Sequence, residues 1–278
     1  MSYTWDDAAP KPDLHVSLAG KVLAGARIVL FLLWMVVVYA SGLLVRLVEP
    51  LAFGAHRPIT HRMIQGFFAV SMAIFGIRVR TEGTPMQTAG VVVANHSSWL
   101  DIFAIYARHR VYFVAKDDVA GWPVVGRLVR FSGALFINRS RRGSAAQIVD
   151  LRDRVLAGQR LNFFPEGTSS DGQRVLPFKP TLFAAFADPA LRDITRVQPV
   201  TIVYTAPKGA DPRFYAWWGQ MTLGPHFIKV VSRLRQGEVK LIYHEPVAVA
   251  DFADRKALAA HCEAVIRARF EAERAKAA

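Results

Sequence analysis

The longest apolar stretch of this 278-residue chain runs from Ile28 to Val45 without a charge, with Arg27 and Arg46 on either side. A helix of about 20 apolar residues crosses the hydrocarbon of a bilayer, so this run is expected to lie in a membrane. The region from Met1 to Leu18 is polar, and no cleavage site of small residues follows the run directly. We therefore interpret the run as a retained anchor and not as a signal peptide that is removed.

A second apolar stretch, Met63 to Ile77, follows a basic connection from Pro50 to Arg62 and is too short to span a bilayer comfortably. Basic residues flank the first run on both sides, so the positive-inside rule gives no clear crossing. We expect a monotopic helical hairpin in the cytoplasmic leaflet, with a single-pass or two-pass anchor as the alternatives. The chain then divides into a polar tail over residues 1–20, a membrane-anchoring helical segment over 21–80 and a globular domain over 81–278.

The formal net charge of +13 calls for an anionic partner, such as nucleic acid, an anionic membrane surface or a phosphorylated substrate. Hydrophobic residues make up 52% of the chain, which is high for a basic nucleic-acid binder. The zinc-ligand spacings and basic aromatic motifs of common nucleic-acid modules are not found in the sequence. We therefore expect a membrane partner and no nucleic acid. The single cysteine, Cys262, excludes an internal disulfide framework.

From about Arg78 onward, short β-branched runs alternate with longer amphipathic stretches. This pattern predicts an α/β fold with a mostly parallel sheet flanked by helices. Helices are expected over Ala145–Ala157 and Arg255–Lys276. The predicted strands are Val91–Ala94, Val111–Ala115, Ala134–Ile137, Leu161–Phe164, Gln198–Tyr204 and Val239–Tyr243.

Charged or polar residues follow three of these predicted strands directly, where ligand sites of parallel sheets lie. His96 follows the first strand, Arg139 the third and Glu166 the fourth. Arg139 opens a basic turn whose guanidinium groups suit phosphate or carboxylate, unless the turn is only a solvated basic patch. Glu166 and Gly167 begin a turn whose backbone N–H groups could approach a polar ligand, and Lys179 is a further cation close to it.

His96 and Asp101 are separated by four residues, a spacing that places them well off a common face of an ideal helix. We therefore expect the segment to bend at a helix start, where Ser97 and Ser98 are suitable capping residues. The carboxylate would then accept from one ring nitrogen, while the other nitrogen takes a proton from a substrate hydroxyl. The alternative interpretation is a helix cap with an incidental histidine.

The sequence does not support three other kinds of site. The glycine spacing from Gly121 to Leu128 is that of a phosphate-binding loop, but the required Lys and Ser or Thr are replaced by Arg127 and Leu128. A glycine-flanked serine elbow, which a hydrolase of the triad type requires, does not occur. No histidine spacing resembles a zinc site, so we expect no bound metal.

Four blocks of the sequence together resemble the 1-acylglycerol-3-phosphate acyltransferase family of glycerolipid acyltransferases, which share a His-four-residues-Asp motif. The resemblance implies the glycerolipid acyltransferase fold, with His96 as the general base and Asp101 as its orienting partner. The four blocks, in the expected order, are Asn95–Asp101, Gly133–Arg139, Phe164–Thr168 and Val197–Ile202.

The same resemblance implies that Arg139 and Glu166 with Gly167 bind the head group and glycerol region of the acceptor. We count Thr168 and Lys179 among the candidate substrate-binding residues as well. The implied reaction is direct transfer of an acyl chain from a thioester, acyl-CoA or acyl carrier protein, to the free hydroxyl of a lysolipid. It requires no cofactor and no metal, and it would take place in membrane lipid biosynthesis on the cytoplasmic face of the bacterial inner membrane.

The chain departs from the commonest pattern at Ser169, because many members of the family carry a basic residue directly after the Glu-Gly-Thr triplet. The stretch from Ser169 to Gly172 resembles the bacterial branch that includes lyso-ornithine lipid acyltransferases. Our first expectation is nevertheless a 1-acyl-sn-glycerol-3-phosphate-type lysophospholipid acceptor, with lyso-ornithine lipid as the alternative. Two alternative functions from other classes are a membrane-anchored lipid-binding protein without catalysis and a lysophospholipase.

Overall fold

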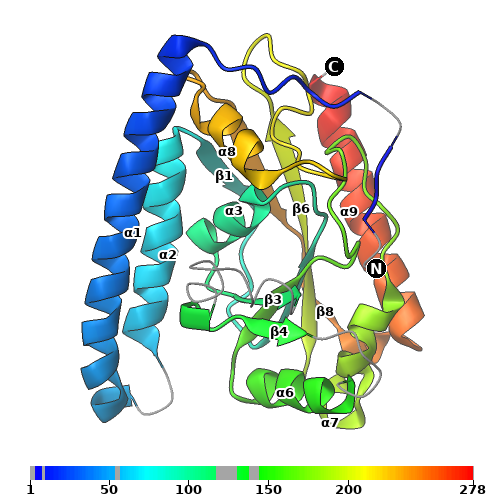
Figure 1. Ribbon diagram of the computed structural model, residues 1–278. Coiled ribbons are helices and arrows are strands. Elements are labelled where there is room, and N and C mark those ends of the chain that lie inside the picture. Colours follow the sequence, from blue (N-terminus) through cyan, green and yellow to red (C-terminus); the bar gives the residue numbers. More distant parts are fainter. Residues whose placement is uncertain (1–3, 8–9, 54–56, 117–129, 138–143, 278) are drawn as a thin grey trace.

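The computed structural model describes residues 4–7, 10–53, 57–116, 130–137 and 144–277 (Figure 1). A helical hairpin lies against a central sheet that has helices on both faces. The strands are β1 (Arg78–Glu82), β2 (Gly90–Ala94), β3 (Tyr112–Lys116), β4 (Leu135–Ile137), β5 (Arg160–Phe163), β6 (Arg196–Thr205), β7 (Glu238–Tyr243) and β8 (Val247–Ala248). The helices are α1 (Leu18–Phe53), α2 (Pro58–Phe75), α3 (Leu100–Arg108), α6 (Ser144–Leu156), α7 (Pro189–Arg192), α8 (Leu223–Val231) and α9 (Arg255–Ala277), with 3-10 turns η1 (Pro180–Ala187) and η2 (Val249–Asp251).

The strands form one sheet in the order β1-β7-β6-β2-β5-β3-β4, and β8 pairs with β6. All pairs in this sheet are parallel except those that β6 makes with β7 and with β8. The prediction of a mostly parallel sheet is therefore confirmed. β2 lies in the middle of the sheet and every one of its residues is buried, which explains why its sequence is continuously apolar instead of alternating.

The six predicted strands correspond to β2 to β7, with ends that differ by at most two residues. Two strands were not predicted. β1 reads RVRTE and lies at an exposed edge of the sheet, where charged side chains remain in water. β8 has two residues, too few for a periodic pattern. The predicted helices over 145–157 and 255–276 are present as α6 and α9, whereas the short helices α3 and α8 were not delimited from the sequence.

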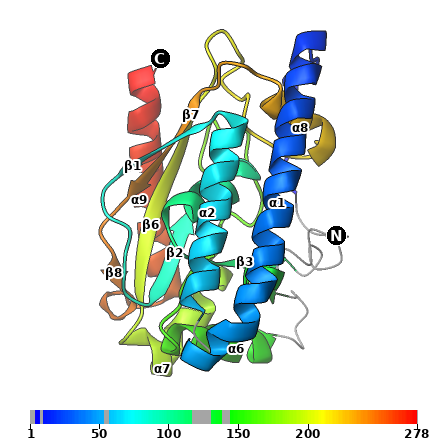
Figure 2. The same cartoon turned by 90° about the vertical axis from the view of Figure 1, so that its left-hand side faces the viewer.

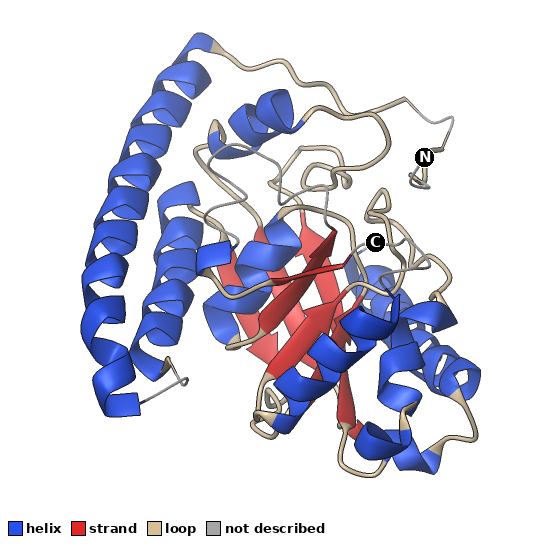
Figure 3. Cartoon of the chain, turned by 60° about the horizontal axis from the view of Figure 1, so that its bottom comes forward, coloured by secondary structure: helices blue, strands red, loops and turns tan. Residues whose placement is uncertain are grey.

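Two apolar clusters pack on opposite faces of the sheet, so that the fold has three layers (Figures 2 and 3). Val92 and Ala94 of β2 face the cluster formed with α2, α3 and α8. Val91 and Val93 face the other cluster, formed with α6, η1 and α9. Cys262 is buried in this second cluster, where it serves as an apolar packing residue. The period of two along β2 fixes which side chains reach each layer.

The two N-terminal helices α1 and α2 run side by side in opposite directions, as Figure 2 shows, so the expected hairpin arrangement is confirmed. α2 packs against α3, and α1 lies outside it. α1 is 36 residues long and, within the described part of the chain, is the one helix long and apolar enough to cross a membrane by length and composition. Its outer surface exposes large apolar side chains along the whole helix, among them Val22, Leu33, Leu44, Leu47 and Leu51.

Polar side chains of α1 fasten this helix to the rest of the protein at both of its ends. Near its start, Arg27 donates to the carbonyl oxygen of Val231 at the end of α8, at 2.9 Å. Near its end, Arg46 donates to the carbonyl oxygen of Phe131 at 2.5 Å. The buried carboxylate of Glu49 accepts from backbone N–H groups at the start of α2. α1 therefore lies along the globular part over its length and does not project from it.

The residues before α1 return to the carboxyl edge of the sheet (Figure 1). We call residues 4–7 and 10–17 the N-terminal segment. The backbone N–H of Trp5 donates to Thr168 Oγ1 at 3.1 Å, and Trp218 Nε1 donates to Asp7 Oδ1 at 3.2 Å. The predicted polar tail over 1–20 thus overlaps α1, which begins at Leu18, and the predicted boundary after residue 80 lies within β1. The division into three domains stays a prediction.

Candidate active site

The chain turns sharply between the end of β2 and the start of α3, and this turn holds the first predicted site residue. The side chain of Asn95 joins the turn to β6, because its amide donates to the Ile202 carbonyl oxygen at 2.9 Å and accepts from the Ile202 N–H at 2.8 Å. The predicted bend at a helix start is therefore confirmed. Trp99 directly precedes α3 and already has helical φ and ψ of −58° and −25°, and Ser98 Oγ accepts from the N–H of Leu100 at 3.3 Å, so the predicted capping role is confirmed for Ser98.

His96 and Asp101 are in direct contact, with 2.7 Å between Nδ1 of the ring and Oδ2 of the carboxylate. The same oxygen accepts from the backbone N–H groups of Ser97 at 2.8 Å and Ser98 at 3.0 Å. The other oxygen accepts from the hydroxyl of Tyr204 at 2.7 Å. Asp101 is fully buried, and these contacts satisfy both of its oxygens, so the carboxylate is held in one orientation.

The imidazole ring of His96 is fixed in its plane as well as in its direction. It stacks on Phe164 with 4.0 Å between ring centroids and an angle of 7°. Its side chain keeps 18% exposure, so a ligand can reach it. No hydrogen bond to Nε2 is found among the described residues. Because Nδ1 donates to the carboxylate, Nε2 carries the free lone pair, which is the arrangement of a general base.

Glu166 lies directly beside this pair but is turned toward the protein. Its Oε1 accepts from the backbone N–H of His96 at 2.9 Å, and its Oε2 accepts from that of Leu176 at 3.2 Å. Burial, which outweighs the opposing effect of these two hydrogen bonds, raises the pKa of the carboxyl group well above its usual range. With 1% exposure, Glu166 supports the backbone of the turn that carries His96. Its role in acceptor binding stays a prediction.

The other predicted site residues lie on the loop that follows β5, with one exception. Gly167 adopts a φ of 69°, a left-handed conformation that favours glycine, and its N–H closes the turn onto the Phe164 carbonyl oxygen at 3.0 Å. Thr168 is buried beneath the N-terminal segment. Lys179 is half-buried, and its backbone N–H donates to the carbonyl oxygen of Pro165, so it too belongs to this loop. Arg139 lies outside the described residues.

Sequence reasoning missed Tyr204 and Phe164 as parts of the site. Burial, and after it the charge of Asp101, raises the pKa of Tyr204 well above its ordinary value, so its hydroxyl stays a neutral donor. Tyr204 ends a strand that the sequence predicts, at the same edge as His96. The rule that sites lie beyond the carboxyl ends of parallel strands could therefore have found it.

The arrangement can remove a proton from a hydroxyl group that approaches Nε2 of His96. The resulting imidazolium would be stabilised by the carboxylate of Asp101. Across the described ranges, no group of three or more His, Cys, Asp or Glu side chains is placed to hold a metal ion. The site as described is therefore a base with an orienting acid, at the carboxyl edge of the sheet and close to the helical hairpin.

Comparison with known proteins gives three kinds of match. The family model described as Acyltransferase matches residues 76–203. A lyso-ornithine lipid O-acyltransferase of Rhodobacter capsulatus is 47% identical, over 95% of this chain and 95% of its own length. A 1-acyl-sn-glycerol-3-phosphate acyltransferase of Neisseria gonorrhoeae is 31% identical, over 72% of this chain and 76% of its own.

Among solved structures, the 1-acyl-sn-glycerophosphate (LPA) acyltransferase PlsC of Thermotoga maritima superposes with a TM-score of 0.60. The match covers 91% of this chain and 98% of that one, at 24% sequence identity. At this identity the likeness concerns the fold alone. The fold class expected from the sequence, an α/β acyltransferase fold with a mostly parallel sheet flanked by helices, is thereby confirmed.

Proposed function

The chain belongs to the acyltransferase family, and we propose that it transfers an acyl chain to the free hydroxyl of lyso-ornithine lipid. It is an O-acyltransferase that acts on lysolipids. This membership speaks against the two readings from other classes, a lipid-binding protein without catalysis and a lysophospholipase. The observation that carries the acceptor is the 47% identity with the Rhodobacter capsulatus enzyme over nearly the full length of both chains. The comparisons thus favour the alternative acceptor over the glycerol-3-phosphate type that we placed first.

The charges near the site support the same acceptor. An ornithine head group carries both a carboxylate and an ammonium group, whereas a phosphomonoester is purely anionic. Two ion pairs place charges of both signs near the loop after Glu166. Asp171 pairs with Arg174 at 2.9 Å, and Asp6 of the N-terminal segment pairs with Lys11 at 2.9 Å. Neighbouring charges of both signs suit a zwitterionic head group better than a dianionic one.

In the proposed mechanism, Nε2 of His96 takes the proton of the acceptor hydroxyl as its oxygen attacks the thioester carbonyl carbon. The carbon–sulfur bond breaks, an ester forms, and the proton on the imidazolium passes to the departing thiolate. Asp101 positions the ring and stabilises its positive charge through Nδ1. Orientation of the two substrates and stabilisation of the oxyanion supply the remaining acceleration. We propose acyl-CoA or acyl carrier protein as the donor, since either presents the required thioester, and Arg139 as a residue that binds the acceptor head group.

The acceptor is tested by offering the purified full-length protein lyso-ornithine lipid and lysophosphatidic acid, each with acyl-CoA and with acyl carrier protein. We expect mass spectrometry to find diacylated ornithine lipid as the main product, formed with at least one of the two donors. The comparison also identifies the donor. Acylation of lysophosphatidic acid alone would overturn the proposed acceptor while leaving the acyltransferase assignment in place.

Tyr204→Phe tests the hydrogen bond that joins β6 to the catalytic pair. Removal of one hydrogen bond to a carboxylate is expected to lower kcat by about tenfold, with little change in the KM of the lysolipid. Tyr243→Phe is the matched control, because the buried hydroxyl of Tyr243 has no hydrogen-bond partner among the described residues. The kcat values are measured from initial rates of product formation. Equal values for the two variants would show that the Tyr204 hydroxyl does not contribute to catalysis.

The apolar surface of α1 indicates that the protein associates with a membrane. We propose in addition that it is a monotopic protein of the bacterial inner membrane, with the active site on the cytoplasmic face. The attachments of Arg27 and Arg46 support this, because a crossing helix would carry the globular part into the hydrocarbon. A helix that lies in the interface instead leaves the site open to lysolipids from the side and to a soluble donor from the cytoplasm.

A further inference from the structure

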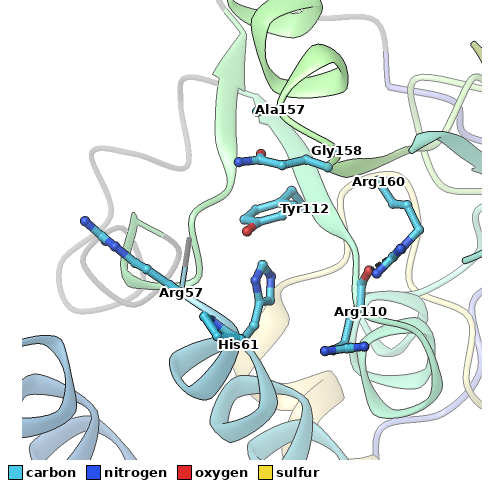
Figure 4. Close-up of a pocket in the computed structure, with 9 residues that line it drawn as sticks. Arg57, His61, Arg110, Tyr112, Ala157, Gly158 and Arg160 are labelled. Atoms are coloured by element: carbon cyan, nitrogen blue, oxygen red, sulfur yellow. Dashed lines mark hydrogen bonds between the residues drawn. The ribbon is translucent and has the colours of Figure 1, made fainter. Parts of the chain in front are cut away.

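A polar cavity with a volume of about 230 Å³ lies at the amino ends of the strands, whereas His96 lies at their carboxyl ends (Figure 4). It is formed where α2 begins, where β3 and β5 begin, and where α6 has just ended. Arg160, which lines the cavity, pairs with Gly90 at the amino end of β2, whereas His96 follows the carboxyl end of that strand. The length of β2 therefore separates the cavity from the catalytic pair.

The cavity is lined by three arginines, Arg57, Arg110 and Arg160, and by no acidic side chain. In the part of the chain that the structure describes, none of these arginines forms an ion pair. Arg160 is held in place by the carbonyl oxygens of Arg110 at 3.1 Å and Gln87 at 2.5 Å. Burial and the charge of Arg110 lower the pKa of Arg160, which reflects an environment that disfavours positive charge. An anion in the cavity would relieve this repulsion.

A nearby carboxylate does not supply that anion. Glu49 of α1 lies close enough to affect the charges in the cavity, but it does not line it. Its oxygens are occupied by the hydroxyl of Thr60 at 2.5 Å and by the N–H groups of Ile59 and Thr60. Glu49 therefore stabilises the first turn of α2; its charge reaches Arg57, but it forms no ion pair with any of the three guanidinium groups in the described part of the chain.

His61 adds a neutral polar group to the cavity. Its ring rises from α2 and meets the edge of Tyr112 with 4.1 Å between centroids (Figure 4). Its Nε2 is buried and makes no well-formed hydrogen bond among the described residues, although the backbone of Val111 lies near the ring. Burial, followed by the charges of Arg110 and Arg160, lowers the pKa of His61 to about 4, so the ring is neutral at pH 7. A bound anion would give this nitrogen a partner, and a buried polar atom without one costs free energy.

We propose that this cavity is a binding site for a phosphate group, separate from the catalytic centre. Guanidinium groups bind phosphate oxygens in two-pronged fashion, and an imidazole N–H can donate to a third oxygen. The favoured source is the head group of an anionic phospholipid. The apolar side chains of Leu47, Leu51 and Ile59 are exposed at the adjoining end of the hairpin, where acyl chains could lie. A bound head group would join the start of α2 to β3 and β5, and so strengthen the attachment of the hairpin.

The test compares the full-length wild type with Arg110→Gln and with the charge-matched control Arg62→Gln. Arg62 is exposed on the same helix as His61 but does not line the cavity. One arm measures binding of inorganic phosphate by calorimetry. The other measures flotation with phosphatidylcholine vesicles that contain or lack phosphatidylglycerol. We expect Arg110→Gln to weaken the phosphatidylglycerol-dependent binding by about tenfold and Arg62→Gln to weaken it much less.

Loss of inorganic phosphate binding in Arg110→Gln, with vesicle binding equal in the two variants, would also support the site but identify a soluble phosphate as its source. Equal binding by Arg110→Gln and Arg62→Gln in both arms would overturn the proposal. Arg57→Gln is the second variant, because Arg57 is exposed at the start of α2 and its loss should leave the fold intact. Both arms measure binding alone, so their outcome does not depend on which lysolipid is acylated.

Discussion

His96→Ala is expected to lower kcat of acyl transfer by about 10²- to 10⁴-fold, because the variant lacks the base that takes the hydroxyl proton. The KM of the lysolipid should change little, since no described contact assigns the ring to binding the head group. Initial rates with purified protein, with ester formation followed by mass spectrometry, measure the effect. Some loss of stability is expected as well, because the variant lacks the ring that donates to buried Asp101 and stacks on Phe164, while the backbone hydrogen bonds of the turn remain.

The matched control for this variant is His261→Ala. His261 is a partly exposed histidine of α9 whose ring lies near Phe252, on the other face of the sheet. Its replacement should leave kcat at the wild-type value. Circular dichroism and flotation with vesicles check that both variants fold and bind membranes. A folded His96→Ala enzyme that keeps near wild-type transfer would exclude the general-base mechanism.

Asp101→Asn is expected to reduce both activity and stability. An asparagine side chain presents an NH₂ group to a place where Asp101 now accepts from the His96 ring, the Tyr204 hydroxyl and two backbone N–H groups. At least one of these buried donors would lose its acceptor, at a cost of about 1–3 kcal/mol in the free energy of unfolding. The ring of His96 would also lose the partner that fixes its tautomer, so kcat should fall by about 10²- to 10⁴-fold.

Two measurements together separate these effects: denaturant unfolding gives the stability, and kcat is read at a temperature where the variant remains folded. Asp193→Asn, at an exposed aspartate, serves as the control for the change of charge and should alter neither quantity. If Asp101→Asn lost stability but kept kcat, the carboxylate would hold the turn without orienting the base.

The site was predictable where a single stretch of sequence carries both partners. His96 and Asp101 lie in one short stretch, so the contact that the structure contains could be expected once the segment was predicted to bend at a helix start. Tyr204 lies about a hundred residues farther along the chain, and its contact with Asp101 depends on β6 lying beside β2. Local patterns do not determine strand order, so this partner could be found only from the fold. The turned-in position of Glu166 is likewise set by a long-range contact, with Leu176.

The same distinction applies to the fold. Strands β2 to β7 were found because burial on one or both faces produces runs of apolar residues. The exposed edge strand β1 carries two arginines and a glutamate, so it lacks an apolar run. Its pairing with β7 cannot be predicted from its own residues. The apolar run from Ile28 to Val45 located the first helix but not its ends. The helix continues beyond the run at both ends, where charged residues, among them Arg27 and Glu49, attach it to α8 and α2.

The contacts of the N-terminal segment bear on the order in which the molecule assembles. Trp5 is hydrogen-bonded to Thr168, and Asp7 to Trp218, across 163 and 211 residues of sequence. During synthesis the partners of these early residues emerge on the order of ten seconds later, so the segment has no place to dock until most of the sheet exists. Contacts between the first residues of the chain and the loop beside His96 therefore form among the last. A bulky affinity tag at the amino terminus would therefore interfere with docking of the N-terminal segment. A tag at the carboxyl terminus, at the end of α9, would not.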